Sequence, residues 1–163
     1  MKSRWIAVSL LTMLAATAFA APDAQQSFDQ IKKLSGSWEG KTSAGMPVQV
    51  SFRVTARGSA VMSEIMGMED DNMISLFNLD GQRLLMTHYC SAGNQPRMTA
   101  TSSADGKTIA FDFLDATNVA GPEAGHMQHV VISVLDPDHH IEEWNYLDHG
   151  KEMKQVFDLR RKK

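Results

Sequence analysis

The sequence contains a single cysteine, Cys90, in 163 residues, so no disulfide can form within the chain. It also lacks a surplus of basic residues, because 16 Lys and Arg stand against 19 Asp and Glu. A basic surplus is what attracts the phosphates of nucleic acids or an anionic lipid surface, so we expect neither as a partner. The chain is 43% hydrophobic, so we expect one domain that is held together by a core of ordinary size.

Long hydrophobic runs are missing as well, because none reaches the about 20 residues that cross a bilayer as a helix. The apolar stretch Ile6–Leu14 follows Lys2 and Arg4 and precedes Ala18-Phe19-Ala20, a small-x-small sequence typical of a signal peptidase site. We therefore predict an export signal that is cleaved near Ala20. The remaining residues, 21–163, are expected to form a periplasmic or secreted domain without stable membrane insertion.

Apolar and polar residues alternate along much of this domain. Val48, Val50 and Phe52 alternate with Gln49 and Ser51, which is the period-two pattern of a strand with one buried face. Similar stretches, separated by turn-forming residues, predict about ten strands near 37–43, 47–55, 59–66, 72–79, 83–90, 96–102, 108–114, 126–135, 140–147 and 153–161.

The short connections between these strands leave no room for crossover helices. Successive strands should therefore pair antiparallel with their neighbours. Closure of such a meander removes the exposed sheet edges, which favours an all-β, up-and-down barrel. Before the first strand, Phe28, Ile31 and Leu34 recur at three-residue spacing and predict a short amphipathic helix.

A Gly-x-Trp sequence, Gly36-Ser37-Trp38, opens the first predicted strand directly after this helix. It resembles the signature of lipocalin or calycin barrels. The segments Asp136–Trp144, Gly150–Glu152 and Phe157–Arg160 are similar to uncharacterised bacterial lipocalin-like proteins of a domain-of-unknown-function family. The likeness covers most of the domain and implies a β-barrel.

The resemblance also implies structural roles for individual residues. In such barrels the tryptophan closes one end, and an arginine near the end of the last strand packs over it. Gly36, Trp38 and Arg160 are therefore expected to be structural, with Arg161 as the other arginine within reach. A guanidinium stacked on a tryptophan contributes about 0.5–2 kcal/mol beyond plain burial.

Polar side chains that share a strand face with apolar ones are the main candidates for binding a ligand. His88 has the parity of Met86, and His129 has the parity of Met127. A buried imidazole needs a hydrogen-bond partner or a ligand. We expect an interior site for a small, largely apolar molecule, lined by Met62, Glu64, Met86, His88, His129 and Trp144. Alternation does not tell which face points inward, so the alternative is that these groups face solvent or satisfy one another.

Copper and haem are the cofactors to weigh. Thioether and imidazole ligands of the kind that suit copper are supplied by Met62, Met66, Met68, Met73, His126, Met127 and His129, although core packing explains the same spacing. Some calycin-type barrels, those of the nitrobindin type, hold ferric haem through one interior histidine. The resemblance makes His88 or His129 the candidate for that ligand.

We expect no enzymatic activity, because the sequence contains no recognisable catalytic machinery. It has no Gly-x-Ser-x-Gly sequence, and Cys90 does not precede a helix that could activate it. Glu142 and Glu143 point to opposite faces of a strand, and His139-His140 is read as a turn and a strand start. A remaining alternative is a barrel filled by its own side chains, with a structural or interaction role.

Overall fold

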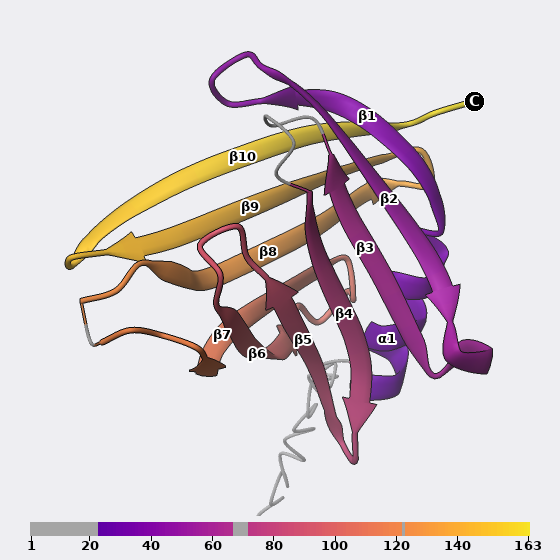
Figure 1. Ribbon diagram of the computed structural model, residues 1–163. Coiled ribbons are helices and arrows are strands. Elements are labelled where there is room, and N and C mark those ends of the chain that lie inside the picture. Colours follow the sequence, from indigo (N-terminus) through magenta and orange to yellow (C-terminus); the bar gives the residue numbers. More distant parts are fainter. Residues whose placement is uncertain (1–22, 67–71, 122) are drawn as a thin grey trace, which may run out of the picture.

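The computed structural model describes residues 23–66, 72–121 and 123–163 (Figure 1). The predicted export signal lies outside these residues, and so does Met68 of the copper set. Within the described residues, no helix has the length and apolar character needed to cross a membrane.

Ten antiparallel strands form one closed barrel in the order β1-β10-β9-β8-β7-β6-β5-β4-β3-β2. The strands are β1 (Gly36–Thr42), β2 (Pro47–Thr55), β3 (Ala60–Met66), β4 (Met73–Asp80), β5 (Arg83–Tyr89), β6 (Gln95–Ser102), β7 (Thr108–Thr117), β8 (His126–Asp136), β9 (His139–Asp148) and β10 (Lys151–Arg161). The barrel closes between the first and last strands, where Trp38 pairs with Arg161 and Thr42 with Phe157. The predicted up-and-down barrel is confirmed.

Helix α1 (Ala24–Lys33) covers one end of the barrel, beside β4 and β5 (Figure 1). Asp23 caps it by accepting a 2.8 Å hydrogen bond from the backbone N–H of Gln26. Phe28 and Ile31 on its apolar face are buried in the core. We call this the helix end. The opposite end, where the β1–β2, β5–β6, β7–β8 and β9–β10 connections lie, is called the loop end.

The helix end is fastened around Trp38, whose indole N–H donates a 2.7 Å hydrogen bond to the Leu34 carbonyl. The Arg161 guanidinium lies 4.2 Å from the Trp38 ring centroid. Arg161 also donates hydrogen bonds to the carbonyls of Ser35 at 2.7 Å and Lys33 at 3.1 Å. One side chain therefore ties the last strand to the segment that joins α1 to β1.

 The structural role expected for Arg160 belongs instead to Arg161. Both Phe157 and Leu159 point into the barrel, so the alternation directs Arg161 inward and Arg160 outward, where it is exposed. Gly36 has its predicted structural role beside this arginine. Its φ of +131° suits glycine, and a Cβ there would lie 2.8 Å from Arg161 Nη1.

Alternate residues of the strands form an inner wall, which faces the barrel interior, and an outer wall, which faces solvent. Val48, Val50 and Phe52 of β2 are at most 3% exposed and belong to the inner wall. Aromatic rings fill the interior toward the helix end, where the ring centroids of Phe77 on β4 and Phe111 on β7 are 5.5 Å apart. This half of the barrel is a packed core.

Candidate functional site

Polar side chains are buried along the inner wall, from His140 beside Trp38 at the helix end to Ser75 and His88 toward the loop end. They include Ser75 on β4, His88 on β5, and His140 and Glu142 on β9, all at most 2% exposed. Buried polar groups destabilise a fold unless they are paired, so their partners show what this region can do.

His88 is held by the neighbouring strand. It pairs directly with Ser75 in the β4–β5 register, and the Ser75 hydroxyl lies 2.9 Å from His88 Nδ1. Among the described residues, no hydrogen-bond partner reaches His88 Nε2, although this nitrogen is buried. Burial lowers the pKa of His88 from 6.5 to about 4, because the charged imidazolium would lose its hydration. The ring is therefore neutral at physiological pH.

A second polar group follows β9 in alternate positions. Glu142 accepts a 2.9 Å hydrogen bond from the indole N–H of Trp144 through one carboxyl oxygen. Its other oxygen lies 3.1 Å from His140 Nε2. Both carboxyl oxygens are thus engaged within the wall, which leaves Glu142 a positioning group for Trp144.

The sequence analysis did not select His140 or Glu142. Glu142 and Glu143 do have the opposite orientations expected for them, since only Glu142 is buried. The missed signal was the period-two series His140, Glu142 and Trp144, which places all three on one strand face. Their burial needed the barrel to be known.

The interior meets solvent at the loop end. Trp144 and Met127 are 5% and 7% exposed, the largest exposed fractions among the buried hydrophobic residues. Both line a surface cavity of about 340 Å³. The other lining residues are Ser43, Ala44, Tyr146, Met153, Lys154 and Gln155. The cavity, which we call the loop-end cavity, therefore has inner-wall side chains in its lining.

Trp144 joins this cavity to His88. Its ring centroid lies 5.0 Å from that of His88, although the two residues come from β9 and β5. The same ring lines the loop-end cavity. Side-chain contacts thus cross the interior here, and Trp144 is in contact with both the cavity and the unpartnered imidazole.

The rim of the loop end is held by specific contacts. Asn94 donates a 2.8 Å hydrogen bond to the Gly125 carbonyl, which ties the β5–β6 and β7–β8 connections together. A Cβ at Gly125 would overlap the Tyr146 hydroxyl, so glycine allows this ring to lie directly against the backbone. Cys90 lies in the same region, and burial raises the pKa of its thiol, which makes it a poor nucleophile.

The six predicted ligand-binding residues divide between the two walls. Met86 and His88 are fully buried on the inner wall, and Trp144 joins them there. Met62, Glu64 and His129 lie on the outer wall instead. The expectation that all six line one interior site is therefore wrong for these three.

The orientation of β3 explains two of these corrections. Val61, Ser63 and Ile65 fill the inner wall, so the residues between them point outward. There, Met62 receives a hydrogen bond from Arg53 at 3.8 Å, and Glu64 accepts one from Asn72 at 3.3 Å.

A bulge explains the third correction. The β8–β9 register shifts between Met127 and His129, which inserts one extra residue into β8. Val130 rather than His129 therefore follows Met127 on the inner wall. His129 Nδ1 lies 2.8 Å from Asp112 on the outer wall.

The placement of these methionines and histidines can be compared with what copper and haem would require. Within the described part of the chain, no three His, Cys, Asp or Glu side chains gather as a metal site. Met62 and Met127 of the copper set lie on opposite walls. A haem held by interior His88 would have to displace Trp144 from its ring contact, and His129 faces away from the interior. In this arrangement, Met62 and Met127 do not share a site, and haem at His88 would require a change in the interior packing.

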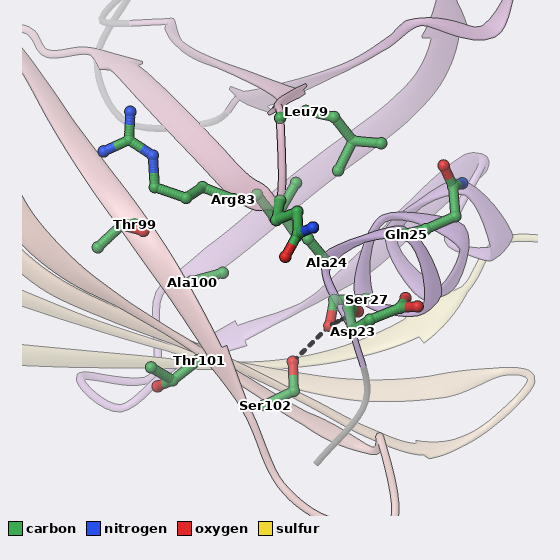
Figure 2. A pocket seen from close by; sticks show the side chains of 13 residues that line it. Asp23, Ala24, Gln25, Ser27, Leu79, Arg83, Thr99, Ala100, Thr101 and Ser102 are labelled. Carbon is green, nitrogen blue, oxygen red and sulfur yellow. Dashed lines mark hydrogen bonds between the residues drawn. The ribbon is translucent and has the colours of Figure 1, made fainter. Parts of the chain in front are cut away.

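A larger surface cavity, of about 630 Å³, lies at the helix end between α1 and the β4–β5 and β6 segments (Figure 2). Ser27 and Ser102 form a 2.6 Å hydrogen bond at its edge. Its charged side chains are engaged elsewhere, since Asp23 caps α1 and Arg83 pairs with Asp80. Among the described residues, no unpartnered buried group lines either cavity, but Trp144 of the loop-end cavity contacts His88, whose Nε2 is such a group.

No family model matches the chain, and no curated protein matches it. Solved structures with a similar fold include the two that follow. Rv2717c from M. tuberculosis matches with a TM-score of 0.57 and 15% identity, over 84% of this chain and 98% of that one. A protein of unknown function from the DUF3598 family of Nostoc punctiforme matches with a TM-score of 0.56 and 12% identity, over 82% of this chain and 49% of that one. At these identities, the likenesses show a similar barrel fold and nothing further.

Proposed function

We propose that the protein is an exported, non-catalytic barrel that binds a small, largely apolar molecule at the loop end. The observation that carries this proposal is the exposure of two inner-wall side chains, Trp144 and Met127, in the loop-end cavity. A ligand seated there would cover apolar surface that the fold itself leaves accessible. The ligand would therefore be placed against the interior rather than on the outer wall.

The size of the cavity sets the class of ligand. Ligand pockets usually measure about 300–1,000 Å³, and the loop-end cavity of about 340 Å³ is at the lower limit. Each 100 Å² or so of apolar surface removed from water contributes about 2.5 kcal/mol. A small hydrocarbon-like molecule can therefore bind in the micromolar range if it buries a few such units.

The packed interior favours a second candidate function. Ring contacts cross the barrel at Phe77 and Phe111, 5.5 Å apart, and at His88 and Trp144, 5.0 Å apart. If these contacts persist in solution, the barrel is a filled scaffold with a structural or interaction role. The two candidates differ in whether a small apolar molecule saturates a site on the protein.

Titration with diphenylhexatriene, a hydrocarbon that fluoresces in apolar surroundings, tests the first candidate. We expect saturable binding with one molecule per chain. Met127→Gln places a polar amide in the cavity lining and should weaken binding about tenfold, which corresponds to about 1.4 kcal/mol. The matched control, Met62→Gln on the outer wall, should bind like the unmodified protein. Absence of saturable binding, or equal effects of both substitutions, would favour the filled scaffold.

Export is the second part of the proposal. It rests on Lys2, Arg4, the apolar stretch Ile6–Leu14 and the Ala18-Phe19-Ala20 sequence. Expression of the full chain in a bacterium, followed by intact-mass measurement, should show a periplasmic product that has lost its first twenty residues. An unprocessed chain retained in the cytoplasm would contradict export and leave the binding proposal to its own test.

A further inference from the structure

The class of ligand can be narrowed by His88, which contacts Trp144 of the loop-end cavity and has one unpartnered ring nitrogen. His88 Nε2 lies further from the backbone than Nδ1, which Ser75 already engages. Nε2 is therefore the ring nitrogen that reaches further into the interior, and no described residue satisfies it. A buried donor or acceptor in this state is well suited to form one hydrogen bond with a bound molecule.

Charge is scarce on this part of the inner wall. None of the buried polar side chains among the described residues is a lysine or an arginine, so no buried cation is available there to neutralise a ligand anion. Lys154, which lines the cavity, is paired with Glu143. Trp144, which contacts His88, is hydrogen-bonded to the Glu142 carboxylate, so the group nearest to a ligand at His88 through Trp144 carries the same charge as a ligand carboxylate.

A cationic group on the ligand would also find no free partner among the described residues of this part of the inner wall. The one buried carboxylate described on this wall, Glu142, has an oxygen bound to Trp144 and the other to His140. A ligand ammonium could reach it only by replacing one of these partners. A buried charge without a partner is strongly disfavoured. A ligand carboxylate or ammonium would therefore lose more hydration free energy on entering this site than a neutral group would.

We propose that His88 Nε2 recognises a neutral hydrogen-bonding group, such as a hydroxyl, on an otherwise apolar ligand. This inference rests on the proposed function and names its ligand class. Trp144 contacts both the cavity and His88, so the polar group would reach Nε2 along the Trp144 ring. The lowered pKa of His88 keeps the imidazole neutral while it makes this contact.

Displacement of diphenylhexatriene by three ligands with the same ten-carbon tail tests the inference at pH 7.5. We expect 1-decanol to bind at least tenfold more tightly than decanoate and decylammonium. His88→Phe keeps an aromatic ring beside Trp144 and should weaken 1-decanol about tenfold while it still binds diphenylhexatriene. His129→Phe, on the outer wall, is the matched control and should change neither.

The outcomes separate this inference from the proposed function. Equal or tighter binding of decanoate or decylammonium would overturn the neutral-group assignment, and so would a His88→Phe variant that retains the affinity for 1-decanol. In each of these cases, diphenylhexatriene binding would still support the apolar site. Failure of the unmodified protein to bind diphenylhexatriene would instead overturn the proposed function.

Discussion

His88 and His129 show how differently the two walls of the barrel treat one residue type. His88, on the inner wall, is fully buried and has one nitrogen on Ser75 and the other unpartnered among the described residues. His129, on the outer wall, lies beside Asp112 with its side chain 31% exposed. Exposed pairs of this kind contribute little to stability or recognition because water competes for both groups. Of these two histidines, the one on the inner wall therefore has the ring nitrogen with which the proposed ligand could form a hydrogen bond.

Glu142 and Glu143 repeat the comparison within one strand. Glu142 is 1% exposed and orients Trp144, whereas Glu143 forms a surface ion pair with Lys154. Adjacent residues with the same side chain thus serve different purposes because alternation sends them to opposite walls. Substitutions at such matched positions measure how much each wall contributes.

Substitutions of these two glutamates should differ most in their effect on the free energy of unfolding. Glu142→Ala removes the partner of Trp144 Nε1 and of His140 Nε2 in a buried setting, so it should reduce the free energy of unfolding by about 3–5 kcal/mol. Glu143→Ala should cost less than about 1 kcal/mol. Urea unfolding at pH 7 measures both. Equal losses would show that burial does not separate the two walls as described.

The free energy of unfolding should depend on pH through His88 on the inner wall. Unfolded His88 takes up a proton below its ordinary pKa of 6.5, whereas folded His88 does so only near about 4. The unfolded state binds more protons in this window, so stability falls as the pH drops from 6.5 to 4, by about 3 kcal/mol at 1.36 kcal/mol per pH unit. His88→Phe should remove this part of the acid destabilisation. Urea unfolding across the window measures it, and parallel curves for the two proteins would contradict the assignment.

Substitutions of the two arginines that end β10 should show a smaller difference in the free energy of unfolding. Arg161→Ala removes the contact with Trp38 and the hydrogen bonds to the Ser35 and Lys33 carbonyls, and should cost about 2 kcal/mol. Arg160→Ala, on the outer wall, should stay within about 0.5 kcal/mol. Thermal unfolding of both variants checks this. A larger loss from Arg160→Ala would restore the role that the sequence analysis gave it.

The fold was predictable because its signals are local. Alternation located the second strand at 47–55, which matches Pro47–Thr55, and the short turns implied antiparallel neighbours. Closure followed from the number of strands and the need to protect sheet edges. None of these steps required knowledge of which face pointed inward.

The site was only partly predictable because it depends on that orientation. Met86, His88 and Trp144 were placed inside, but Met62 and Glu64 share an equally regular pattern on the outer wall. Alternation is symmetric between the two faces, so it could not separate these cases. The prediction for His129 was wrong for another reason. A single-residue bulge in β8 reverses the alternation after Met127, and the sequence contains no clear signal for this bulge.

The central claim, that an apolar molecule binds at the loop end against the inner wall, is tested most directly by ¹⁹F NMR of protein labelled with 5-fluorotryptophan. Trp144 lines the loop-end cavity and Trp38 is packed at the helix end, so one spectrum reports on both ends of the barrel. Addition of 1-decanol should shift the Trp144 resonance and leave that of Trp38 in place. An unchanged Trp144 resonance at saturating ligand, or a shift confined to Trp38, would contradict the account.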